Sequence, residues 1–255
     1  MARIGVVSDI HSNANAFMAV LNELGRHDVE ELYCLGDIVG YGPAPARCLD
    51  LALTYCDVLV RGNHDEAVFV EGAQAQFNPI AWAAIEWTRK QLSDRDLDAL
   101  LHMKTREITS MGVTCAHDTP VENETAYVLD LLTASEALAA LTTPIGLVGH
   151  THVPRVFSAP TDIIGDGFCP PEAVEVIVPL AGEPIELRAD HLVLCNPGAV
   201  GQPRDSDPRA SCAVLDTKAR TFTVHRVDYD IQQTRIETIE AGLLAILGER
   251  LFEGL

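Results

Sequence analysis

The sequence has few basic residues, no long apolar run and no closely spaced cysteine pair. Lys and Arg number 18 against 37 Asp and Glu, which gives a formal net charge of −19. A field of this sign repels polyanions, so we expect no basic face that binds duplex nucleic acid. No apolar stretch reaches the length of about 18 residues that a membrane span needs. The start of the chain, MARIGVVSD, meets an acidic residue too early for a signal peptide.

The seven cysteines are odd in number and include no C-x-x-C pair. Several lie inside apolar runs, which is typical of reduced core residues. This pattern argues against both a disulfide framework and a thiolate zinc site. We therefore expect a cytoplasmic protein.

Apolar residues make up 47% of the 255 residues and charged residues 22%, as in ordinary folded proteins. We expect a single domain, 1–255, because large α/β domains reach this length. In the first half, short runs rich in Val and Ile alternate with segments of helical periodicity, which predicts βαβ units and parallel strand pairs. The expected strands are 3–8, 32–37 and 56–61, and the expected helices are 13–25, 46–54, a segment reaching Trp87, and 93–103.

The second half contains more β-like runs than helical ones. Residues 159–190 are punctuated by Pro and Gly, and we interpret them as an inserted loop plus a hairpin. Helices are expected near 135–141 and 235–247. The expected strands are 107–109, 112–116, 145–149, 153–157, 174–178, 192–195, 212–216 and 221–227.

Polar residues cluster where the expected strands end, which is where ligands gather in α/β sheets. In extended backbone, residues i and i+2 face the same side, so Asp9 with His11, and His150 with His152, are each expected to aim two ligands into one site. Carboxylate, imidazole and amide oxygen donors without thiolates favour Mn, Fe, Zn, Co or Ni. The candidates exceed the ligands of one tetrahedral ion, so two ions that share a carboxylate fit better. The candidate ligands are Asp9, His11, Asp37, Asn63, His117, His150 and His152.

These residues form the motif series D-x-H, G-D-x-x, G-N-H-D, H and G-H-x-H, in that order. Any one of these motifs is weak, but five in order are highly specific. The sequence resembles the calcineurin-like metallophosphoesterase superfamily and, within it, the prokaryotic small phosphodiesterase branch. Segments such as GDIVGYGP and NPGAVGQPRD extend the resemblance to Asp205.

The resemblance implies a two-sheet α/β sandwich (α-β-β-α) with helices on its outer faces and a dinuclear metal centre at the strand ends. It also implies how the ligands divide between the ions. One ion would be bound by Asp9, His11, Asp37 and His152, and the other by Asp37, Asn63, His117 and His150. Asp37 would then bridge the two ions.

The chemistry implied by the resemblance is hydrolysis of a phosphodiester or phosphomonoester. Two divalent ions (Mn, Fe, Ni or Zn) would activate a hydroxide that attacks phosphorus. His64 would give a proton to the leaving oxygen or hold a phosphoryl oxygen. Asp65 would orient His64 or cap the following helix, and Arg204 is a candidate for binding the substrate phosphate.

Two departures from relatives bear on the substrate. Protein phosphatases of the superfamily carry D-R-G after the bridging aspartate, whereas Gly40, Tyr41 and Gly42 lie there in this chain. In the phosphodiesterase branch a glycine commonly follows the single ligand histidine, whereas Asp118 follows His117 here. A phosphodiesterase is our first expectation, and its partner would be a small phosphorylated molecule. The alternatives are a phosphoprotein or dinucleoside polyphosphate phosphatase and, in another class, a non-catalytic metal-binding scaffold for protein partners.

Overall fold

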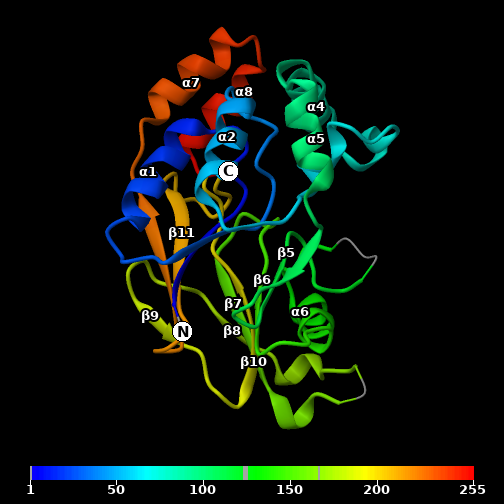
Figure 1. Ribbon diagram of the computed structural model, residues 1–255, viewed down its shortest axis with the longest axis vertical. Helices are drawn as coiled ribbons and strands as arrows, with labels where there is room; N and C mark the ends of the chain where they lie inside the picture. Colours follow the sequence, from blue (N-terminus) through cyan, green and yellow to red (C-terminus); the bar gives the residue numbers. More distant parts are fainter. Residues whose placement is uncertain (1, 123–125, 166) are drawn as a thin grey trace.

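The chain forms two six-stranded sheets. Figure 1 shows how the strands and the surrounding helices are arranged. The structure, a computed structural model, describes residues 2–122, 126–165 and 167–255. The first sheet has the order β3 (Val58–Leu59), β2 (Glu31–Cys34), β1 (Arg3–Val7), β11 (Ala210–Asp216), β12 (Thr221–Val227) and β9 (Pro184–Glu186). The second has the order β4 (Arg106–Ile108), β5 (Val113–Ala116), β6 (Ile145–Leu147), β10 (His191–Asn196), β7 (Arg155–Pro160) and β8 (Glu175–Ile177).

The two sheets pack face to face, with helices on the outside. Ile4 and Phe222 of the first sheet share a buried apolar cluster with Cys115 and Leu147 of the second. Helix α1 (Ala14–Leu24) packs on β11 and β12, and helix α6 (Leu131–Ala139) packs on β10 and β7. Figure 1 shows these two helices on opposite sides of the molecule. The expected two-sheet α/β sandwich is confirmed.

Parallel pairing occupies the part of each sheet nearest the candidate ligands. Strands β1, β2 and β3 are mutually parallel, and β1 pairs antiparallel with β11 on its other side. In the second sheet, β6 lies between β5 and β10 and is parallel to both. The carboxyl ends of parallel strands meet at one edge of a sheet, so the loops after β1, β2, β5 and β6 come together there.

Helix boundaries follow local capping chemistry. Asn13 caps α1 by accepting a hydrogen bond from the Ala16 amide, and Gly25 ends the helix, as the sequence predicted. Ser93 and Asp96 form the expected capping box. The other helices are α2 (Pro45–Tyr55), α3 (Asn63–Ala67), α4 (Pro79–Gln91), α5 (Asp94–His102), α7 (Ile231–Glu240) and α8 (Ala245–Glu249). No helix of the described residues is long and apolar enough to cross a membrane.

Two expectations about local structure are wrong. In the described residues of 159–190, β8 and β9 do not pair with each other as a hairpin, because β8 pairs with β7 whereas β9 pairs with β12 in the other sheet. The segment therefore crosses from one sheet to the other. The helix expected over 235–247 is two helices, α7 and α8, separated at Gly242, whose φ of 78° ends the first of them.

All seven cysteines lie in the described part of the chain and none forms a disulfide. Cys56 is half-buried and the others are buried. They fill the core, as the sequence predicted.

Candidate metal centre

Five of the seven candidate ligands lie in tight turns just beyond the strand ends. Asp9 and His11 have φ values of 54° and 46°, Asp37 of 52°, and His150 and His152 of 65° and 60°. Asp and His adopt this left-handed conformation more readily than most residues. The expectation that extended backbone places the i and i+2 pairs on one side is therefore wrong. Backbone of this kind costs about 1–3 kcal/mol per residue and is typical of functional sites.

Hydrogen bonds between the loops hold these turns in place. The Asp9 amide donates to the Gly36 carbonyl at 3.0 Å, and the His11 amide to the Asp37 carbonyl at 2.9 Å. The His150 amide donates to Oδ2 of Asp9 at 3.1 Å, which joins the two sheets at the site. Each loop is therefore positioned by another loop that carries candidate ligands.

Glycines allow the close approach of these loops. A β-carbon at Gly62 would lie 2.1 Å from Oδ1 of Asp37, and one at Gly149 would lie 1.9 Å from Oγ of Ser8. Neither glycine has a positive φ, so the absence of a side chain, and not backbone freedom, is what the site requires at these two positions.

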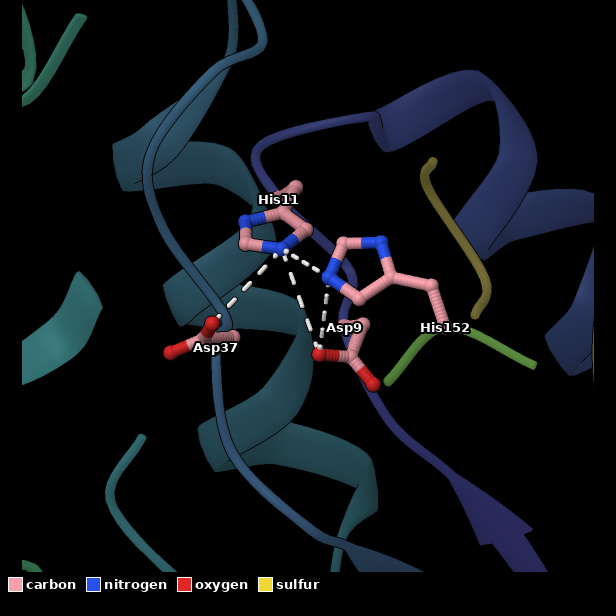
Figure 2. A group of neighbouring side chains, drawn as sticks. All are labelled: Asp9, His11, Asp37 and His152. Atoms are coloured by element: carbon pink, nitrogen blue, oxygen red, sulfur yellow. Dashed lines mark hydrogen bonds and ion pairs between the residues drawn. The ribbon is translucent and has the colours of Figure 1, made fainter. Parts of the chain in front are cut away.

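The first group of donors consists of Asp9, His11, Asp37 and His152, all buried, with donor atoms within 4.8 Å of one another. In Figure 2 their side chains converge on one point. Nε2 of His152 lies 3.1 Å from Nε2 of His11 and 3.3 Å from Oδ1 of Asp9, and Nε2 of His11 lies 3.6 Å from Oδ2 of Asp37. A tetrahedral ion bound at about 2.0–2.1 Å sets its donors about 3.3–3.4 Å apart. The group therefore has the spacing that a single ion needs.

The tautomers of two imidazoles also favour a cation. Nδ1 of His11 lies 3.2 Å from the Val39 carbonyl, and Nδ1 of His152 lies 2.6 Å from the Gln202 carbonyl. A carbonyl only accepts, so each Nδ1 carries the proton and each Nε2 presents a lone pair. Two lone pairs 3.1 Å apart repel each other unless a proton or a cation lies between them. Backbone carbonyls that fix the free nitrogen in this way are the usual partners of metal-binding histidines.

The second group contains Asp37, His117 and His150, whose donor atoms also lie within 4.8 Å of one another. Nε2 of His117 lies 3.3 Å from Oδ2 of Asp37, the same oxygen that faces His11 in the first group. Nδ1 of His117 lies 2.7 Å from the Leu35 carbonyl, so its Nε2 is directed at the carboxylate. Oδ1 of Asn63 is buried, has no hydrogen-bond partner in the described structure, and belongs to a residue that lines the same cavity as Asp37 and His150.

The charges of the buried ligands are strongly coupled. Burial raises the pKa of Asp9 to about 7. Burial also acts to raise the pKa of Asp37, but the nearby His117 holds that pKa well below its usual range. Burial opposes protonation of His117, yet the Asp37 carboxylate raises its pKa to about 10. Asp37 and His117 therefore form an ion pair without metal, and a bound cation would replace the proton on His117.

The other four imidazoles at the site are neutral at pH 7. Burial holds the pKa values of His11 and His152 well below their usual range. It lowers the pKa of His150 to about 3 and that of His64 to about 4. Neutral imidazole is the form that binds metal.

His64 lies beside the two groups of donors. It belongs to α3, is buried, and its ring contacts those of His11, Tyr41 and Phe77 at centroid distances of 4.8, 4.5 and 5.0 Å. Its Nδ1 has no hydrogen-bond partner in the described structure. Asp65 accepts hydrogen bonds from the Gly62 and Val39 amides and so caps α3, which is the second of the two roles expected for it.

A cavity of about 210 Å³ opens over these donors. It is lined by Asp37, His64 and Arg204, and also by residues that the sequence did not single out. Among these are Tyr127, whose ring stacks on His150 at 3.8 Å, and Arg250. Neither lies in a motif, and no local pattern of the sequence could have identified them.

The structure thus brings together the seven candidate ligands, His64 and Arg204. Asp118, which follows His117, belongs to neither group of donors, and its Oδ1 accepts a hydrogen bond from the Thr119 amide at 2.8 Å. Its carboxylate is therefore engaged locally.

Comparisons with known proteins identify the family of the chain. The family model of the calcineurin-like phosphoesterase superfamily domain matches residues 2–220. An uncharacterized protein of Methanocaldococcus jannaschii is 34% identical over 260 residues, which cover 98% of each chain. The crystal structure of a metallophosphoesterase from Sphaerobacter thermophilus is 36% identical, with a TM-score of 0.84 over 100% of this chain and 99% of that one. A hypothetical protein from Pyrococcus horikoshii, 15% identical, shares the fold with a TM-score of 0.76 over 100% of this chain and 99% of its own. With this fold and a matching family model over most of its length, the chain belongs to the calcineurin-like phosphoesterase superfamily.

Proposed function

We propose that the protein is a metal-dependent phosphoesterase that hydrolyses small phosphodiesters, or phosphomonoesters, at a centre of two divalent ions. The observation that carries this proposal is the position of Oδ2 of Asp37. It lies 3.6 Å from Nε2 of His11 and 3.3 Å from Nε2 of His117, which belong to different groups of donors. This position supports the proposal that the Asp37 carboxylate would be shared by the two ions.

The donor set fits such a centre. The first ion would be held by Asp9, His11, Asp37 and His152, and the second by Asp37, Asn63, His117 and His150. Imidazole and carboxylate donors suit Mn, Fe, Ni or Zn. When bound, two such ions acidify water and neutralise the charge of a phosphate. Without them, the Asp37 carboxylate, which lines the cavity, would repel a phosphate bound next to it.

The protein side chains around the cavity supply orientation and proton control. Oδ1 of Asp37 accepts a hydrogen bond from the His64 amide at 2.9 Å, which ties the position of His64 to that of the shared carboxylate. Burial lowers the pKa of His64 to about 4, so the free protein presents a neutral imidazole. This form can donate an N–H hydrogen bond to a phosphoryl oxygen, and an anionic substrate raises the pKa toward that of a general acid. Arg204 lines the same cavity and can pair with a phosphate oxygen.

The experiment is metal analysis of the purified protein, followed by assays of the metal-free protein supplied with Mn, Fe, Ni, Zn or Mg. The substrates are bis(p-nitrophenyl) phosphate as the diester and p-nitrophenyl phosphate as the monoester. We expect two ions per chain and metal-dependent hydrolysis, with the diester preferred. A strong monoester preference would overturn the diester assignment. Metal binding without hydrolysis of either ester would favour the non-catalytic scaffold.

A further inference from the structure

Two arginines from distant parts of the chain line the cavity over the candidate metal centre. Arg204 follows the segment NPGAVGQP, and Arg250 lies at the end of α8. Both are half-buried. The Arg204 guanidinium carbon lies 5.9 Å from the centroid of the Tyr41 ring, which lines the cavity as well. Arg250 lies beyond residues 2–220, which the family model matches.

Neither guanidinium has an Asp or Glu side chain as a partner in the described structure. No Asp or Glu side chain of the described residues lies within 4.0 Å of either one, although acidic residues outnumber basic ones by 37 to 18 in the chain. Nη2 of Arg204 donates to Oε1 of Gln202 at 3.2 Å, and its Nε is buried without a partner. Arg250 donates from Nε to the main-chain oxygen of Leu255, and its two Nη groups make no hydrogen bond within the described residues.

The two positive charges also oppose each other. Burial and the neighbouring Arg204 lower the pKa of Arg250. A half-buried cation beside another cation is unfavourable unless an anion lies close to both. Arg has planar, paired donors that match phosphate oxygens, which makes a phosphate group the anion of closest fit.

The cavity is many times larger than the space that a single water needs. A single water needs roughly 10–15 Å³ of cavity, whereas this cavity measures about 210 Å³. Its walls include the rings of Phe77 and Tyr127 and the amide side chains of Gln76 and Asn78. Aromatic and amide groups would contact the uncharged part of a phosphorylated molecule.

We propose that Arg250, together with Arg204, binds a second phosphate group of the substrate, beside the phosphate that is hydrolysed at the metal centre. The preferred substrates are then phosphoesters with two phosphates rather than one. This inference rests on the proposed function, because it assigns a substrate class to the same cavity.

The test uses two esters that differ only in the second phosphate: the p-nitrophenyl ester of thymidine 5′-phosphate, with and without a phosphate on the 3′-oxygen. The measured quantity is the ratio of their kcat/KM values. We expect the wild type to favour the doubly phosphorylated ester by about 10-fold or more, since charge-assisted hydrogen bonds to a phosphate are lost with the other ester. Arg250→Met should lower this ratio by about 10-fold, chiefly through KM, and Arg250→Lys should lower it less.

The matched control is Arg89→Met, which removes the same charge from an exposed position on α4. It should keep the wild-type ratio, and melting temperatures of all variants show whether they fold. Hydrolysis with an unchanged ratio in a folded Arg250→Met variant would overturn this inference and leave the proposed function standing. Absence of hydrolysis with every ion would remove the proposed function and this inference with it.

Discussion

A methyl group added at Gly62 is expected to displace the carboxylate shared by the two groups of donors. The β-carbon of Gly62→Ala would lie 2.1 Å from Oδ1 of Asp37 and 2.4 Å from the Asp37 amide nitrogen. Rotation of the carboxylate cannot relieve the contact with the backbone nitrogen. Both atoms must move, the oxygen by about 1 Å or more to reach ordinary contact distance.

The energetic cost can be bounded. Overpacking of this kind costs about 1–3 kcal/mol. In a protein of this size, each kcal/mol shifts the melting temperature by about 2–4 °C, so the metal-free variant should melt about 2–12 °C below the wild type. Movement of Asp37 by this amount should also abolish binding of at least one ion and lower turnover by about 100-fold.

The assay combines thermal unfolding of the metal-free protein, metal content and ester hydrolysis at saturating metal. Gly25→Ala is the matched control, because Gly25 has a φ of −60° and a β-carbon there meets backbone oxygens at 3.5 and 3.6 Å. We expect this control to be neutral or stabilising by about 0.4–1 kcal/mol. A Gly62→Ala protein with the wild-type melting temperature, two bound ions and full turnover would refute the reasoning.

Three further predictions concern histidines and an asparagine. Replacing His64 with Ala should lower turnover by about 10²–10⁴-fold while both ions remain bound, and loss of an ion on metal analysis would contradict this role. His152→Ala should weaken one ion and Asn63→Ala the other, as followed by calorimetric metal titration; loss of the same ion in both variants would argue against two separate sites. Burial and the nearby His27 lower the pKa of His225, so the unfolded chain binds its proton more readily and the free energy of unfolding should fall as the pH drops below about 6.5. In urea unfolding, the His225→Gln variant should lack this contribution to the fall in the free energy of unfolding between about pH 7.5 and about pH 5.5. An unaltered pH dependence would show that His225 contributes none of that fall.

Local chemistry made much of the fold predictable from the sequence. The cap at Asn13 and the capping box of Ser93 and Asp96 act within a few residues, so the pattern alone located their helices. The pairing of 159–190 is different. Whether β9 pairs with β8 or with β12 is decided by contacts with Thr221–Thr223, which are distant in sequence. The sequence of 159–190 itself therefore does not indicate which strand β9 pairs with.

The candidate site was likewise predictable from the sequence only in part. The motifs identified the candidate ligands that the structure brings together, but the reasoning from extended backbone was wrong, because Asp9 and His150 lie in left-handed turns held by hydrogen bonds between loops. Tyr127 and Arg250 were missed, since each reaches the cavity from a segment with no local motif. Their positions at the cavity depend on the tertiary structure, which brings together segments that are distant in sequence.

The position of β1 between β2 and β11 has a consequence for synthesis on the ribosome. β1 and β2 emerge early, but β11, which covers the other edge of β1, begins only at Ala210. Until then the nascent chain carries an open strand edge at β1, and such edges are prone to aggregate. The first candidate ligand, Asp9, follows β1 and is therefore made about 200 residues before β11, the strand that pairs with β1. Translation arrested before Ala210 should therefore give insoluble fragments.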